Sequence, residues 1–117
     1  MNIEEVRDYC THKKGATESF PFDNKVLVFK VMNKVFALTN IEEADSINLK
    51  CEPERAIELR EQFMGIQKGF HMSKKHWNTV LIEPDVNRKL LEELITHSYD
   101  LITGKLTKKE KEGLNQL

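Results

Sequence analysis

One stretch of the chain gathers side chains that could contact a polyanion. Between Gly65 and Asn78 the sequence has no Asp or Glu, although the whole chain is balanced, with 19 acids and 18 Lys and Arg residues. Ammonium groups beside an aromatic ring can hold phosphates while a base stacks on the ring. The stretch offers both kinds of group, in Lys68, Phe70, His71, Lys74, Lys75, His76 and Trp77.

The same residues allow a simpler interpretation. Trp77 would belong to the core, and the lysines would keep an edge strand soluble. Lysines that only solvate a surface are common, so the residues taken alone favour this second interpretation. The choice between the two depends on the elements that position the stretch.

Other chemistry has little support in the sequence. No Cys or acidic cluster stands near His71 and His76 to complete a metal site. Gly65 and Gly69 match no phosphate-binding fingerprint, and no Ser, Cys or His occupies a nucleophile elbow. The sequence predicts a protein that is not an enzyme, with no catalytic residue, metal or cofactor. A small-molecule or metal-linked activity is the least supported class.

Composition limits the number of domains, the expected localisation and the kinds of partner. The 117 residues suffice for one domain, 1–117, and a formal net charge of −1 argues against coating nucleic acid by bulk charge. Cys10 and Cys51 are expected to be reduced, buried thiols. The acidic N-terminus lacks the apolar stretch of a secretion signal, and no apolar run is long enough to span a membrane. We therefore expect a cytoplasmic protein that makes no membrane contact.

Two strands are predicted on either side of a tight turn. Residues 26–32 and 35–39 are rich in β-branched and aromatic residues, and Asn33-Lys34 is interpreted as a two-residue hairpin loop. Pairing across this loop sets Val31 opposite Phe36. One face, expected to be buried against the helices, carries Leu27, Phe29, Val31, Phe36 and Leu38, and the other carries Val28, Lys30, Ala37 and Thr39.

The remaining elements follow from helical periodicity, alternation and caps. Between the hairpin and the first helix, Phe20 and Phe22 are expected to hold a loop against the core; an exposed binding patch is the alternative. Ile47 and Leu49 should face the core, while Asn48 and Lys50 face outward. We expect helices at 3–14, at 53–64 and from a cap at Asp85 to Gly104. A short basic tail helix is expected within about 105–117, with a capping box of Thr107 and Glu110, and Gly113 and the last residues should fray. Strands are expected at 46–50 and 77–83, with an extended segment at 70–72 and a turn at 73–76.

This order predicts an α+β two-layer sandwich with a largely antiparallel sheet. Each helix has a single apolar stripe, so the helices are expected to cover one face of the sheet. The second face then has no cover. Because it carries Lys30, Asn48 and Lys50, this open face is the first place to look for a partner.

Several runs of the sequence occur in the same order in one known family. They are residues 29–31, 34–37, 49–53, 69–80 and 98–101, and the most specific is the His-Met-x-Lys-x-His-Trp run from His71 to Trp77. Through them the chain resembles the MmcQ/YjbR family over nearly its whole length. The resemblance implies a CyaY-like, double-wing fold of order α-β3-α-β2-α in a small bacterial protein. It also implies DNA binding, with no catalytic residues to carry over.

Together these observations predict a non-enzymatic DNA-binding module that is a monomer. A protein-interaction adaptor that uses the open face is the alternative; a contiguous basic patch would favour DNA, and an apolar patch would favour a protein partner. Trp77 is expected to anchor its turn in the core rather than to offer a stacking surface. The predicted nucleic-acid contacts are Lys30, Lys34, Lys50, Lys68, His71, Lys74, Lys75, His76 and Trp77.

Overall fold

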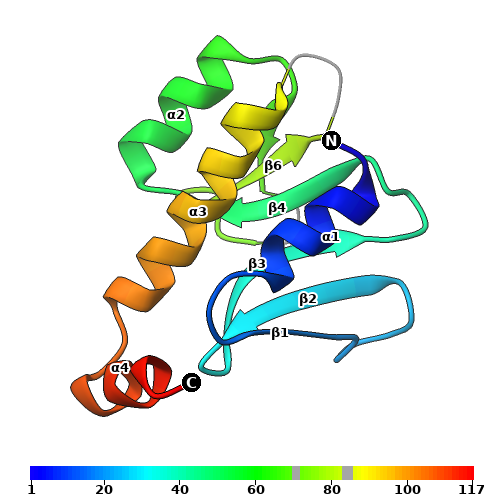
Figure 1. Cartoon of the computed structure of the whole chain (residues 1–117). Coiled ribbons are helices and arrows are strands. Elements are labelled where there is room, and N and C mark those ends of the chain that lie inside the picture. The colour runs from blue at the N-terminus through cyan, green and yellow to red at the C-terminus, as the bar shows by residue number, and fades with distance from the viewer. Residues whose placement is uncertain (70–71, 83–85) are drawn as a thin grey trace.

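The protein folds around one six-stranded sheet, described here from a computed structural model (Figure 1). The structure describes residues 1–69, 72–82 and 86–117. The strand order is β1-β2-β3-β4-β6-β5, and every neighbouring pair is antiparallel. The elements are α1 (Ile3–Thr11), β1 (Ala16–Ser19), β2 (Val26–Val31), β3 (Lys34–Asn40), β4 (Ser46–Lys50), α2 (Pro53–Gln62), β5 (Ile66–Lys68), β6 (Trp77–Leu81), α3 (Arg88–Gly104) and α4 (Lys108–Asn115).

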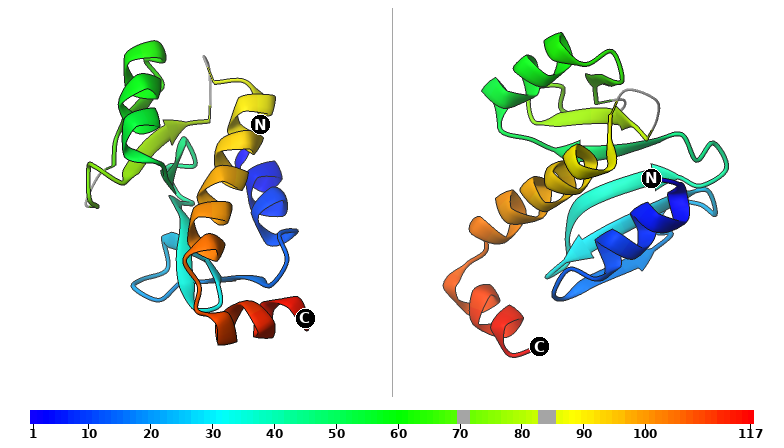
Figure 2. Two further views of the ribbon diagram at one scale, coloured as in Figure 1. Left: turned by 90° about the vertical axis from the view of Figure 1, so that its left-hand side faces the viewer. Right: turned by 45° about the horizontal axis from the view of Figure 1, so that its top comes forward.

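The main helices cover one face of this sheet. Figure 2 shows α1 and α3 on the same side of the strands. Ala56 and Leu59 of α2 join the same buried core as Leu49, Val80 and the apolar stripe of α3. The predicted α+β class, with an antiparallel sheet and a helix-covered face, is confirmed. Lys50 and Asn48 alternate with the buried residues of β4 and therefore lie on the open face, as expected.

Two strands differ from the sequence prediction. Strand β1 occupies part of the segment predicted to be a loop and pairs with β2 at the edge of the sheet through backbone hydrogen bonds. Its sequence, ATES, is not rich in the β-branched and aromatic residues that predict a strand. Strand β5 ends at Lys68, before the extended segment predicted at 70–72, of which residues 70 and 71 lie outside the described residues. The turn at 73–76 is confirmed.

The predicted hairpin register is wrong by one residue. Met32 and Asn33 form the turn, with φ of 48° and 65°, the two positive values that a type I′ turn requires. Val31 consequently pairs with Lys34. Further along, Phe29 pairs with Ala37 while Lys30 pairs with Val35, so Phe36 is the extra residue of a β-bulge.

The bulge decides which residues of β3 reach the core. Phe36 and Ala37 are both buried on the helix-covered side, where the Phe36 ring meets Tyr99 of α3 edge-on, with 5.4 Å between ring centroids. Beyond the bulge the alternation is shifted, and Leu38 lies on the open face instead of in the core. Leu27, Phe29, Val31, Phe36, Ile47 and Leu49 are buried in the core as predicted.

The ends of the helices also refine the prediction. Asn87 caps α3, accepting a hydrogen bond from Leu90 N; Asp85, the predicted cap, lies outside the described residues. The Thr107–Glu110 capping box of α4 is confirmed, and the helix continues through Gly113, from which the chain was predicted to fray, to Asn115. Leu114 is only 8% exposed and lies over Gly15, whose φ of 72° reverses the chain after α1.

Within the described part of the chain, no helix combines the length and the apolar character needed to cross a membrane.

Candidate functional site

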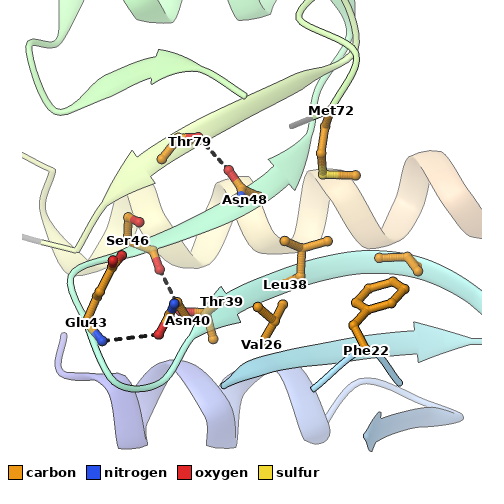
Figure 3. A pocket seen from close by; sticks show the side chains of 11 residues that line it. Phe22, Val26, Leu38, Thr39, Asn40, Glu43, Ser46, Asn48, Met72 and Thr79 are labelled. Carbon is orange, nitrogen blue, oxygen red and sulfur yellow. Dashed lines mark hydrogen bonds between the residues drawn. The ribbon is translucent and has the colours of Figure 1, made fainter. Parts of the chain in front are cut away.

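An apolar cavity of about 550 Å³ lies on the open face of the sheet (Figure 3). Its position follows from the shifted alternation of β3, which turns Val35 and Leu38 toward this side. Phe22 and Val26 continue the apolar wall, and Met72 borders the cavity from the segment before β6. The polar lining residues are Thr39, Asn40, Glu43, Ser46, Asn48 and Thr79.

The two asparagines of this lining are held in fixed orientations. Thr79 Oγ1 donates a hydrogen bond to Asn48 Oδ1 at 2.5 Å. Asn40 Oδ1 accepts hydrogen bonds from Glu42 N and Glu43 N. In both residues the amide oxygen is therefore occupied, and the Nδ2 group points the other way as a hydrogen-bond donor. Of the lining residues that the structure describes, Glu43 is the one with an ionisable side chain.

Phe22 is the most exposed of the apolar residues described in the cavity wall, with 76% of its surface accessible. Phe20 is exposed as well. The expectation that these two rings hold their loop against the core is wrong, and the exposed patch is what the structure contains. Asp23 fixes the loop instead, because its carboxylate accepts hydrogen bonds from Lys25 N and Val26 N, which lower its pKa.

Part of the predicted cationic set gathers at one end of the same face. Lys30 pairs with Val35 across β2 and β3, and Lys50 pairs with Trp77 across β4 and β6. Because β3 and β4 are antiparallel, the start of β3 and the end of β4 lie at the same end of the open face, and the residues of these two pairs are called the row below. Val35 also lines the cavity, which places the row at the border of the apolar wall. Burial, followed by repulsion from Lys105, lowers the pKa of Lys50. An anion bound here would relieve that repulsion.

The turn at 73–76 is attached to the rest of the protein through its backbone. Arg60 of α2 donates a hydrogen bond to Lys74 O at 2.9 Å, and Cys51 N donates to His76 O at 2.8 Å. Lys74 and Lys75 are exposed, while His76 is half-buried. The fixed turn thus holds two exposed ammonium groups beside the start of β6.

Trp77 is half-buried and lies on the open face rather than in the core. The alternation of β6 shows this, because Asn78 reaches Ala56 O of α2 and Val80 joins the core. The expectation that Trp77 anchors the turn in the core is therefore not met. On this face it is the cross-strand neighbour of Lys50.

Other predicted contacts do not join this row. Lys34 pairs with the core residue Val31, which places it toward the helix side, and its charge interacts with Glu110 of α4. Lys68 pairs with Asn78 on the edge strand β5, also toward the helix side. His71 lies outside the described residues.

Residues 1–69, 72–82 and 86–117 contain neither a cluster of metal ligands nor an activated cysteine. No group of three or more His, Cys, Asp or Glu side chains there could hold a metal ion. Burial raises the pKa of the Cys10 thiol to about 12 and also raises that of Cys51, which disfavours the nucleophilic thiolate. The absence of a metal, a cofactor and an enzymatic activity stays a prediction.

Sequence reasoning identified the open face but missed its cavity. Asn48 was expected to face outward, and Phe22 as an exposed patch was kept only as an alternative. The sequence does not predict the bulge at Phe36. Without this bulge Leu38 would belong to the core, and the apolar wall of the cavity would lack it.

Comparison with known proteins gives the family. A sequence model described as YjbR matches residues 11–101. The chain belongs to the YjbR family. It is 31% identical to the Escherichia coli K12 protein YjbR, with all of both chains covered, and 33% identical to YyaQ of Bacillus subtilis, covering 86% of this chain and 98% of that one.

Solved structures of similar proteins agree with this fold. The crystal structure of a Deinococcus radiodurans protein, 39% identical, matches 97% of this chain and 88% of its own with a TM-score of 0.91. A Pseudomonas syringae protein, 29% identical, gives a TM-score of 0.74 over 86% of this chain and 98% of its own. Both YjbR and YyaQ are described as uncharacterized, so membership supplies the fold and leaves the function to be argued from the site.

Proposed function

We propose that the protein is a non-enzymatic, cytoplasmic DNA-binding module that takes a single strand across its open face. The observation that carries the proposal is the row formed by Lys30, Lys50 and Trp77 at the border of the cavity. Cations and an aromatic ring in one row match the alternation of phosphates and bases along a strand.

The form of the site favours a single strand over a duplex. Base stacking needs unpaired bases, and aromatic rings on a sheet face bind them with about 1–3 kcal/mol per base. Trp77 is half-buried and Phe22 is exposed, so both can offer ring surface to a base. Because few ammonium groups gather here and the net charge is −1, we expect modest affinity that falls as salt is raised.

A salt titration with single-stranded and double-stranded DNA tests the proposal. The variant Lys74→Ala with Lys75→Ala should weaken binding and reduce the salt slope by about one unit for each lost phosphate contact. Lys108→Ala with Lys109→Ala is the matched control, because α4 lies at the opposite end of the strand order from β6 (Figure 1). Equal affinity and equal slope in both double variants would remove the turn from the DNA-binding site.

A protein-interaction adaptor is the second candidate, and the apolar wall with the exposed Phe22 favours it. Apolar patches bordered by polar residues mark protein interfaces. The two functions differ in their dependence on salt. If Phe22→Ala abolishes binding of a partner while the Lys74 and Lys75 substitutions leave it unchanged, the adaptor function replaces DNA binding.

A further inference from the structure

We propose that the open-face cavity holds one unstacked base of the bound strand. This inference rests on the proposed function and adds to it the part of the ligand that enters the cavity. The lysine row would hold the phosphates outside, while the base leaves the stack and lies between Phe22, Val26 and Leu38.

The size and the walls of the cavity suit a flat ring. At about 550 Å³ the cavity is within the range of small-molecule sites, about 300–1,000 Å³. Phe22, Val26, Val35, Leu38 and Met72 supply apolar surface around it, and Figure 3 shows Phe22 beside Val26 and Leu38 at one side. A heteroaromatic ring would bury its faces there.

The polar lining residues favour a ligand that has hydrogen-bond acceptors. Because Thr79 occupies Asn48 Oδ1, the free donors of Asn48 are those of Nδ2. Asn40 offers the same group, since its Oδ1 accepts from Glu42 N and Glu43 N. Carbonyl oxygens or ring nitrogens of a base would accept these hydrogen bonds, whereas an aliphatic chain would leave the donors unpaired.

The distribution of charge matches a neutral ring attached to an anion. Among the described residues that line the cavity there is no Lys or Arg, and the one ionisable residue, Glu43, lies beside Asn40 and Ser46. The cationic residues Lys30 and Lys50 lie at the other end of the face, where β3 begins and β4 ends. The cavity, whose described lining carries no cation, therefore receives the base, and the row receives its phosphate.

The variant Asn48→Asp tests the donor directly. A carboxylate still accepts the hydrogen bond from Thr79, but it replaces the Nδ2 donor by an acceptor. Gln67→Glu is the matched control: Gln67 pairs with Thr79 on the same face, is exposed, does not line the cavity, and gains the same charge. Thermal unfolding of Asn48→Asp and Gln67→Glu verifies that both variants are folded. Leu38→Phe is a further cavity variant, because it narrows the cavity without adding charge.

Affinity is measured for a short thymidylate oligomer and for a strand of the same length without bases. On the intact strand, Asn48→Asp should weaken binding about tenfold more than Gln67→Glu, the cost of one lost hydrogen bond that leaves polar groups unpaired. On the strand without bases the two variants should be equal. Equal losses on the intact strand as well would show that the base lies outside the cavity, while DNA binding itself stands.

Titration with free thymidine separates this inference from the proposed function. The Nδ2 proton signals of Asn48 should shift in the wild-type protein, and Leu38→Phe should reduce the shift. If neither strand binds but thymidine shifts these signals, the base cavity stands and DNA binding fails. If thymidine leaves the signals unchanged, the inference is overturned.

Discussion

Replacing Ser98 by Ala should destabilise the fold far more than the loss of one hydroxyl on a surface would. Ser98 is fully buried on α3. Its Oγ donates a hydrogen bond to Phe36 O at 2.5 Å and accepts one from Lys50 N at 2.9 Å. Phe36 belongs to β3 and Lys50 to β4, so one hydroxyl connects two strands and the helix that covers them.

The expected cost follows from the two backbone groups left behind. Each buried polar group without a partner costs about 1–3 kcal/mol. Phe36 O is fully buried, whereas Lys50 is half-buried and its amide has some access to water. We therefore expect Ser98→Ala to lower the free energy of unfolding by about 2–4 kcal/mol.

Urea denaturation followed by Trp77 fluorescence and far-UV circular dichroism measures this change. Thr103→Ala is the control on the same helix, because Thr103 Oγ1 bonds only the neighbouring Asp100 O; it should change stability by no more than about 0.5 kcal/mol. A cost below about 1 kcal/mol for Ser98→Ala would mean that β3 and β4 close and bond each other directly. The hydroxyl would then not be needed to connect the strands.

Three further predictions concern stability and reactivity. His97 Nε2 accepts a hydrogen bond from Glu52 N, and burial, followed by the charge of Arg55, lowers the pKa of His97. The stability that this neutral imidazole contributes should be retained above the unfolded pKa of about 6.5 and decline as pH falls below it. In His97→Gln the midpoint of urea unfolding should therefore depend less on pH between about 7.5 and 5.5. Leu114→Ala should cost about 2–3 kcal/mol in the same assay, whereas substitution of the exposed Leu117 by Ala should cost much less. Neither Cys10 nor Cys51 should react with a thiol reagent at pH 8 until urea unfolds the chain; rapid modification of the native protein would contradict their burial.

Periodicity and capping were sufficient to predict most of the elements. The Asn2–Glu5 and Thr107–Glu110 capping boxes begin α1 and α4 as their sequences indicate. Pro53 begins α2, and Leu91, Leu94 and Ile95 are buried along the stripe of α3. These are local signals, since each depends on residues within one or two turns of the chain.

The errors share a different cause. Asn33 is suited to either central position of a type I′ turn, so the sequence does not choose between Met32-Asn33 and Asn33-Lys34. The choice depends on burying both Phe36 and Ala37 against the helices, which the bulge permits. Ile57 of α2 and Met64 just after it are also exposed, although both are apolar, because the buried face of this helix carries Ala56 and Leu59. Such errors concern contacts between distant elements.

The cavity has the same origin as the error in register. Between β3 and β4 the paired register covers only Ala37 with Leu49 and Leu38 with Asn48. On one side of this short ladder Thr39 Oγ1 donates to Ser46 O, and on the other Ser98 Oγ bonds Phe36 O and Lys50 N. Side-chain hydroxyls thus take the place of ladder hydrogen bonds at both ends.

This arrangement links stability to the proposed binding site. Leu38 and Asn48, one of the two pairs of the short ladder, both line the cavity. Without the Ser98 hydroxyl, Phe36 O loses its hydrogen bond, so the bulge at Phe36 loses its support and Val35 and Leu38 shift relative to Asn48. The same substitution should then weaken thymidine binding even though Ser98 lies on the helix-covered side of the sheet. Loss of stability with unchanged thymidine binding would show that the cavity depends on the bulge alone and not on the bridging hydroxyl.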